Sequence, residues 1–167
     1  MKKLLGFSIF LVFVLIASLT AEAKVTLPAI FSDNMVLQQN TQVNVWGKAA
    51  PGEKVTVKAS WLDKAVTAKA AANGKWTVKL KTPKAITNQS VTVSGENEIT
   101  INNVLIGEVW LCTGQSNMEF PVSRHPDVKW NTGMLNEAEE LKDADYPEIR
   151  LFHVKHQLAH EGELDDC

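Results

Sequence analysis

Two short runs in which apolar and polar residues strictly alternate constrain the fold more than any other feature of the chain. The apolar face of Lys54–Trp61 consists of Val55, Val57, Ala59 and Trp61, and that of Lys75–Lys81 consists of Trp76, Val78 and Leu80. Successive side chains of a strand point to opposite faces of its sheet. The pattern therefore predicts antiparallel strands with one buried face and one solvated face.

Further short extended runs, separated by turn residues, precede and follow these two. They are Val25–Phe31 (interrupted by Pro28), Met35–Gln39, Gln42–Trp46, Val66–Ala70 and the runs around Val91, Val93, Ile99 and Ile101. Pro51-Gly52 and Asn73-Gly74 are turn signals, and the second is typical of a hairpin. About eight short strands with regularly spaced turns indicate an antiparallel β-sandwich. We expect it over Lys24–Asn103.

The N-terminal segment has the pattern of a secretory signal peptide. Lys2 and Lys3 precede an almost wholly apolar run, Leu4–Leu19, and Thr20–Ala23 ends in an Ala-x-Ala pattern. The alternative is a retained membrane anchor, but the apolar run is short for a span and no basic cluster follows it. We expect cleavage near Ala23 and export to the periplasm or the medium, with no stable membrane association afterwards.

Composition describes an ordinary globular protein without a strongly charged surface. Hydrophobic residues make up 45% and charged residues 22%, and the formal net charge is -2. With no block of like charges, no nucleic-acid partner is expected. The cysteines, Cys112 and Cys167, can oxidise in an exported protein, but two unpaired thiols are an equally open interpretation, with Cys112 a small core residue. Two distant cysteines do not make a metal site.

The pattern changes at Val104. The run Val104–Cys112 is mostly apolar without alternation, as in a strand buried on both faces of a parallel sheet. Asn131–Ala144 has the spacing of an amphipathic helix, and Ile149–Val154 is expected to be the next strand. Strand, helix and strand indicate the first βαβ part of an α/β domain over residues 104–167, which is incomplete at the end of the sequence.

Three tryptophans in the first part of the chain admit two interpretations. Trp46, Trp61 and Trp76 are suited to stacking against sugar rings, or they fill the core of the sandwich. Two of them fall on the apolar face of their strands. Core packing is therefore the favoured interpretation.

Ser116 is the candidate nucleophile. It follows the apolar run, two residues after Gly114, which lets the backbone turn sharply. A serine hydroxyl requires a base and oxyanion donors, and the backbone N–H groups of a turn that begins just after Ser116 supply part of the second requirement. The second glycine of a lipase-type elbow is missing, so spacing alone leaves an ordinary turn serine open.

The stretch Gly107–Pro121 closely resembles the signature of the sialate O-acetylesterase family, which belongs to the SGNH (GDSL-like) hydrolases. Similar to further stretches of that family are Ser32–Gln39, Val45–Gly47 with Ala50–Glu53, Asn73–Trp76 and Pro147–Phe152. The resemblance implies an SGNH-type hydrolase domain, an acetylated glycan or sialic acid as substrate, and no metal or other cofactor. It also implies that Ser116 attacks the acetyl ester, that its own backbone N–H serves the oxyanion hole, and that water then hydrolyses the acetyl-enzyme.

The histidines and aspartates that follow Ser116 are not assigned to the site. They are His125, His153, His156, His160, Asp165 and Asp166, among others. The resemblance implies that the catalytic aspartate, the histidine and the remaining oxyanion donors come from segments beyond Cys167. His125 lies too close to Ser116 for the family's base, and the other histidines fall in the expected strand Ile149–Val154 or in a polar tail.

Two functions therefore stay open at this stage. The first is an exported carbohydrate esterase that removes O-acetyl groups from sialic acid or related glycans by a serine nucleophile, this chain being an inactive fragment because its base is missing. The second is a non-catalytic exported β-sandwich that binds glycans or partner domains. A xylan or another plant glycan is an alternative substrate for the first.

Overall fold

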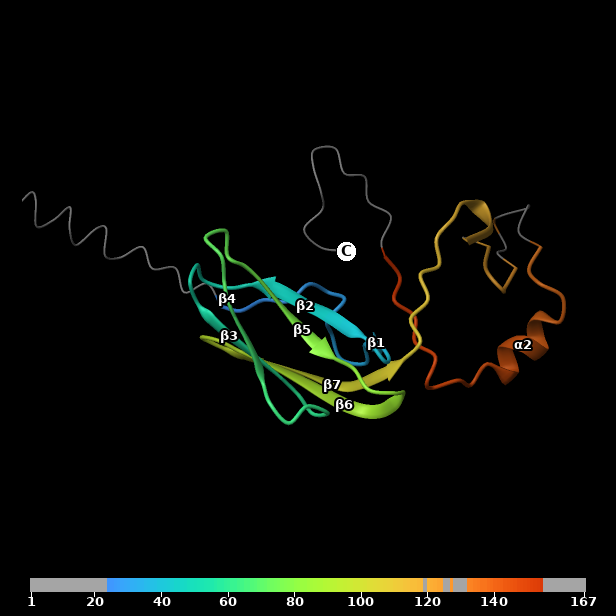
Figure 1. Cartoon of the computed structure of the whole chain (residues 1–167). Helices are drawn as coiled ribbons and strands as arrows, with labels where there is room; N and C mark the ends of the chain where they lie inside the picture. Colours follow the sequence, from blue (N-terminus) through green and yellow to red (C-terminus); the bar gives the residue numbers. More distant parts are fainter. Residues whose placement is uncertain (1–23, 119, 125–126, 128–131, 155–167) are drawn as a thin grey trace, which may run out of the picture.

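The computed structural model describes residues 24–118, 120–124, 127 and 132–154. Its secondary structure is almost entirely β, which confirms the mostly β fold class. The strands are β1 (Val36–Gln38), β2 (Gln42–Lys48), β3 (Lys54–Ala59), β4 (Val66–Lys69), β5 (Lys75–Lys81), β6 (Ile86–Ser94) and β7 (Glu98–Gly107) (Figure 1). Among the described residues after β7 are the 3-10 turn η1 (Ser116–Met118) and the short helix α2 (Glu137–Asp143).

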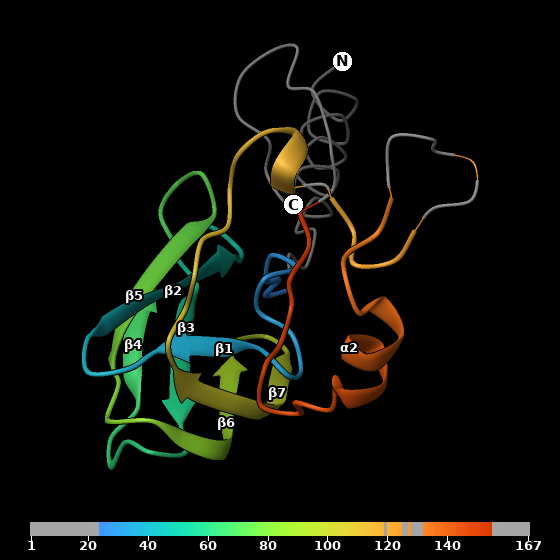
Figure 2. The ribbon, with the colours of Figure 1, turned by 90° about the vertical axis from the view of Figure 1, so that its right-hand side faces the viewer.

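The described strands form two sheets that face each other across one core (Figures 1 and 2). One sheet has the strand order β1-β7-β6-β3-β4, and the other pairs β2 with β5. The pairs are antiparallel as expected, with the exception of β1 and β7, which run parallel with Val36 opposite Leu105. The parallel pair places the ends of β1 and β7 at the same edge.

Alternation in the sequence becomes alternation in burial. In β5, Trp76, Val78 and Leu80 are buried while the intervening side chains are exposed. The opposite sheet contributes Val55 and Val57 from β3, with Val91, Val93, Ile101 and Val104 from β6 and β7. Each buried side chain of this size stabilises the fold by roughly 1.5–3 kcal/mol relative to its exposed state. The predicted faces of the two alternating runs are confirmed.

The Asn73-Gly74 turn forms, and its glycine has a φ of 76°. However, the strands that it joins belong to different sheets, because β4 pairs with β3 and β5 pairs with β2. The turn therefore carries the chain from one layer of the structure to the other. The expectation of a hydrogen-bonded hairpin at this position is wrong.

The strand expected at Val104–Cys112 ends earlier. Val104, Leu105 and Ile106 are buried, but Trp110 is 83% exposed and Leu111 is 90% exposed. The reason is the register: Gln38 of β1 lies opposite Gly107, and Ile86 of β6 opposite Ile106. Past Gly107 the backbone has no neighbouring strand to pair with, and a lone strand is not stable in water. The buried strand through Cys112 is thus wrong.

The expectation of Cys112 as a small core residue is wrong as well, because its free thiol is exposed. The helix is shorter than expected: α2 covers Glu137–Asp143 within the predicted Asn131–Ala144, and none of its seven residues is buried. Ile149–Val154 forms no strand, and Leu151 is 95% exposed. Each of these elements lacks the packed neighbour that would hold it.

Several predictions fall outside the described residues. They concern the signal peptide (residues 1–23), His125, His156, His160, Asp165, Asp166 and Cys167. In the part of the chain that is described, no helix combines the length and apolar character needed to cross a bilayer.

Candidate active site around Ser116

Ser116 opens the single turn η1, which an extended segment connects to the end of β7 (gold in Figure 2). The residue is exposed, and the Met118 N–H donates to the Gln115 carbonyl at 2.8 Å to close the turn. Gly114 allows this packing, since a Cβ atom there would lie 2.8 Å from Cγ of Met118. A residue with a side chain at position 114 would push Met118 away from the turn.

The described residues bring no base to this serine. Within residues 24–118, 120–124, 127 and 132–154, no hydrogen bond joins the Ser116 hydroxyl to a histidine or a carboxylate. His153 is exposed, and the same residues contain no cluster of histidine, cysteine and carboxylate side chains that suits a metal ion. The described geometry thus presents a candidate nucleophile without the rest of a triad.

A hydrogen-bonded cluster lies where β7 ends. Both carboxylate oxygens of Glu108 accept hydrogen bonds, one from Nε2 of Gln38 at 2.9 Å and one from Nε2 of Gln39 at 2.7 Å. Because these amide donors stabilise the charged carboxylate, Gln38 first and Gln39 second, the pKa of Glu108 is lowered from 4.5. Charge-assisted hydrogen bonds of this kind are stronger than neutral ones.

A second set of contacts lies beside the first, between Ser32–Gln39 and β7. Oδ1 of Asp33 accepts a hydrogen bond from the backbone N–H of Asn102 at 2.6 Å. Nδ2 of Asn103 donates to Oδ1 of Asn34 at 2.8 Å. The guanidinium of Arg150, from the C-terminal segment, donates to the Asn103 carbonyl. Four polar side chains thus link three distant parts of the sequence at one strand.

Sequence reasoning missed this cluster. Glu108 is a charged exception inside an apolar run, and Ser32–Gln39 is a turn followed by a short strand. One signal was available: both stretches belong to those that resemble the esterase family, yet Ser32–Gln39 carries no catalytic group. Only the parallel pairing of β1 with β7 brings Gln38 and Gln39 to Glu108.

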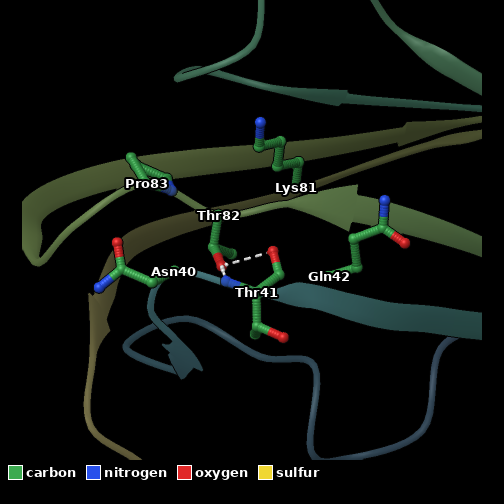
Figure 3. A pocket seen from close by; sticks show the side chains of 6 residues that line it. All are labelled: Asn40, Thr41, Gln42, Lys81, Thr82 and Pro83. Atoms are coloured by element: carbon green, nitrogen blue, oxygen red, sulfur yellow. Dashed lines mark hydrogen bonds between the residues drawn. The ribbon is translucent and has the colours of Figure 1, made fainter.

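An open cavity of about 490 Å³ lies at the start of β2 and the end of β5 (Figure 3). Its lining residues are Asn40, Thr41, Gln42, Lys81, Thr82 and Pro83. The buried hydroxyl of Thr82 accepts from the Thr41 N–H and donates to the Thr41 carbonyl, both at 3.1 Å. These bonds satisfy the hydroxyl, so the cavity has no free buried polar group from Thr82.

The three tryptophans of the first region take different positions. Trp76 is buried, as the core interpretation predicts, and Trp61 packs on the edge of the core while its Nε1 donates to the Lys81 carbonyl at 2.9 Å. Trp46 is 42% exposed. Its ring meets Phe31 edge-on, with ring centroids 4.6 Å apart. The core interpretation thus holds for Trp76 and Trp61 and is wrong for Trp46.

Comparison with solved structures gives the class of protein to which this fold is related. A carbohydrate acetylesterase from Xanthomonas citri superposes with a TM-score of 0.57 and is 36% identical, over 62% of this chain and 24% of that one. The β architecture described above is therefore shared with a carbohydrate acetylesterase. No protein-family model matches the chain.

Comparison with curated sequences gives the particular family. Sialate O-acetylesterases from Mus musculus and Rattus norvegicus are 31% and 30% identical over 150 residues. The chain is a homologue of the sialate O-acetylesterases, which confirms the resemblance seen in its motifs. The match covers 83% of this chain and 26% of each of these proteins, so the chain spans about a quarter of their length.

The match includes the candidate nucleophile. A continuous stretch of 83% of 167 residues is about 139 residues long, and wherever it begins it contains positions 29–139. Ser116 and Glu108 both lie within these positions, as do Gln38 and Gln39. The homology therefore extends over the whole of the exit from β7.

Proposed function

We propose that this chain is part of an exported carbohydrate O-acetylesterase in which Ser116 is the nucleophile. The observation that carries the proposal is the homology to sialate O-acetylesterases across a stretch that contains Ser116. The substrate is an O-acetylated sialic acid or a related acetylated glycan. Export follows from the signal-peptide pattern that ends at Ala23.

The reaction has two acyl-transfer steps. The Ser116 Oγ attacks the acetyl carbonyl while a base takes its proton, the sugar oxygen leaves with a proton, and the acetyl group stays on Ser116. Water then attacks this ester, releasing acetate and restoring the hydroxyl. Each step passes through an oxyanion that N–H donors stabilise, and no metal or other cofactor takes part.

The base and most of the oxyanion donors come from additional polypeptide that corresponds to the rest of the relatives. Two features support this part of the proposal. The chain spans 26% of these relatives, and large apolar side chains from Val109 to Val154 are exposed. We propose that the chain after β7 is the beginning of an SGNH-type hydrolase domain, whose exposed apolar side chains the remaining polypeptide covers.

The proposal predicts that the 167-residue chain by itself has negligible esterase activity, since a serine without its base loses several orders of magnitude in rate. Hydrolysis of an aryl acetate measures this, with Ser116→Ala as the comparison. Enzyme-like turnover that Ser116→Ala abolishes would show that the chain is sufficient alone. That result would contradict the requirement for further polypeptide.

A hybrid tests the nucleophile itself. In the Xanthomonas citri acetylesterase, this chain replaces the part that it matches, about 24% of that protein. We expect acetyl release from acetylated sugars by the hybrid and its loss, by at least roughly a thousandfold, in Ser116→Ala. Ser123→Ala, the next serine along the chain, serves as the matched control. Full activity of Ser116→Ala in an active hybrid would refute the assignment.

A second candidate function, glycan binding without catalysis, is supported by Trp46. Its ring is 42% exposed on β2 and is held edge-on by Phe31, so that an aromatic face is available for stacking. Titration calorimetry with acetylated and plain glycans tests this function, with Trp46→Ala as the variant and Trp61→Ala as the control. An unchanged heat of binding in Trp46→Ala, or no detectable heat in the parent protein, would contradict glycan binding through Trp46.

A further inference from the structure

We propose that Glu108, held by Gln38 and Gln39, is a positioning residue that fixes the direction in which the Ser116 segment leaves β7. The three side chains together are called the exit clamp below. The inference rests on the proposed role of Ser116 for its functional meaning. Its structural content, a defined path for the segment after β7, is independent of that role.

The exit clamp uses each of its amide groups twice. Nε2 of Gln38 donates to Glu108, and Oε1 of Gln38 accepts from the Val109 N–H at 2.8 Å. Nε2 of Gln39 donates to Glu108, and Oε1 of Gln39 accepts from the Ala85 N–H at 2.8 Å. Neither glutamine can rotate its amide without losing bonds at both ends. The clamp therefore specifies one orientation of Glu108 and Val109.

The clamp continues the parallel pairing of β1 with β7 beyond the last strand residue. The Gln39 N–H donates to the Gly107 carbonyl at 2.8 Å, and the side chains of Gln38 and Gln39 then reach the next two residues. This is the point at which β6 no longer accompanies β7. Beyond Gly107, side-chain hydrogen bonds from Gln38 and Gln39 therefore replace the backbone hydrogen bonds of the sheet.

Beyond Val109 the described chain has few attachments before the turn that carries Ser116. Among the described residues, no hydrogen bond involves Trp110, Leu111, Cys112, Thr113 or Gly114, and the next one is the Gln115 carbonyl with the Met118 N–H. From Trp110 to Gly114 the direction of the chain therefore depends on the contacts at Glu108 and Val109. A rotation at Glu108 would therefore displace Ser116, eight positions further along, by more than it displaces Val109.

The role of Ser32–Gln39 follows from the same contacts. Asp33 and Asn34 bind β7 at Asn102 and Asn103, and Gln38 and Gln39 bind it at Glu108. A stretch without any group suited to acetyl transfer thus lies along the strand that leads to the nucleophile. Its polar side chains act through the position of Ser116.

The first test follows the base of the segment by hydrogen exchange of the full chain. In Glu108→Ala we expect the Val109 amide to exchange roughly tenfold faster, because Gln38 is no longer held against it, while the core amides of Val91 and Val93 are unchanged. Glu98→Ala is the matched control: it removes a carboxylate at the other end of β7 that accepts from Oγ of Ser94 at 3.0 Å. Glu108→Gln, which keeps the shape and one acceptor, should give a smaller increase.

The second test follows the segment itself through a nitroxide label on Cys112, in a Cys167→Ser background. We expect Glu108→Ala and the double variant Gln38→Ala, Gln39→Ala to narrow the electron paramagnetic resonance spectrum, and Glu98→Ala to leave it unchanged. Unchanged Val109 exchange and an unchanged label in Glu108→Ala would overturn the proposal. So would an equal response to Glu98→Ala, or an equal loss of protection at Val91 and Val93, because these indicate a general effect on stability.

The activity of the hybrid esterase separates this inference from the proposed function. We expect Glu108→Ala to lower kcat about tenfold or more with little change in KM. An enzyme whose nucleophile is misplaced still binds its substrate but reacts more slowly. An inactive hybrid would contradict the proposed function, whereas the exchange and label experiments would still decide the exit clamp. An active hybrid with an unchanged kcat in Glu108→Ala would refute its effect on Ser116.

Discussion

Residues 24–107 and residues 108–154 both contain many large apolar side chains, but only the first region buries them. In the first region apolar residues alternate along strands and fill one core, and every described buried apolar residue lies before position 107. In the second region the large apolar side chains stay outside: of the 16 exposed large hydrophobic residues that are described, all but Ile30 and Trp46 follow Gly107.

An apolar side chain stabilises a fold only when a second packed element removes it from water. The strands of the first region form two sheets whose apolar faces meet, so that their buried side chains are almost wholly removed from water. Among its described residues, the second region has the turn η1, the helix α2 and irregular chain, and none of their side chains is buried. Exposed apolar surface of this kind is typical of interaction sites, in keeping with the additional polypeptide proposed above.

The largest expected contrast is in proteolysis. Trypsin should cleave at Arg124, Lys142 and Arg150 roughly a thousandfold faster than at Lys58 and Lys79, although all these side chains except the half-buried Arg150 are exposed. Cleavage in the strands requires the cooperative sheets to open, whereas the second region needs only local opening. Timed digestion with mass spectrometry measures the order. Simultaneous cleavage in both regions would remove the contrast.

Truncation of a core side chain should separate the regions next. Leu80→Ala removes a fully buried side chain between the sheets and should lower the free energy of unfolding by about 2–5 kcal/mol. Leu151→Ala is the matched control, because Leu151 is 95% exposed, and its effect should stay within about 0.5 kcal/mol. Urea unfolding followed by tryptophan fluorescence measures both. A large cost for Leu151→Ala would mean that the second region is packed.

Two glycines give a smaller version of the same contrast. A Cβ at Gly47 would strike the Thr26 carbonyl and lie 2.9 Å from Cζ2 of Trp76, while one at Gly107 would meet nothing within 4 Å. We expect Gly47→Ala to cost about 1–3 kcal/mol, because the strand edge and the Trp76 ring must move apart. Gly107→Ala should be within about 0.5 kcal/mol of the parent. Thermal unfolding of both variants decides, and equal costs would contradict the packing described for β2.

The smallest expected effect lies at the boundary between the regions and depends on pH. The folded pKa of Glu108 is below its ordinary value of 4.5, because Gln38 and Gln39 donate to the carboxylate. The stabilisation by the exit clamp is therefore present above the unfolded pKa and is lost as pH falls through the lowered folded pKa. The side-chain amide resonances of Gln38 and Gln39 should titrate with a midpoint below 4.5.

The control for this titration is the double variant Gln38→Ala, Gln39→Ala, observed at the Glu108 carboxyl carbon. Its midpoint should move back toward 4.5, since both donors are gone. A parent midpoint at or above that of the double variant would contradict the hydrogen bonds of the exit clamp.

The sequence predicted the parts of the fold that depend on local alternation. The faces of Lys54–Trp61 and Lys75–Lys81 are correct because a strand that packs on one side must alternate. The prediction of buried strands from the apolar runs Val104–Cys112 and Ile149–Val154 was wrong. Whether such a run is buried depends on a neighbouring strand, and composition alone does not reveal whether that neighbour is present.

The candidate site divides in the same way. Ser116 and the family came from a contiguous motif, Gly107–Pro121, and the homology to sialate O-acetylesterases bears out the family. The catalytic role of Ser116 and the export of the chain stay predictions, which the experiments above address. The exit clamp was not predictable, because Gln38 and Glu108 are 70 residues apart.

The β character of residues 24–107, the relationship to acetylesterases and the candidate nucleophile could all be predicted from the sequence. Each of these depends on residues close together in the sequence, either on the alternation of apolar and polar residues or on a contiguous motif. The three-dimensional fold was needed to show that β1 runs parallel to β7, that β7 ends at Gly107, and that Gln38 and Gln39 bind Glu108 there. These facts depend on which distant segments pair, and that is settled by the packing of two sheets on one core.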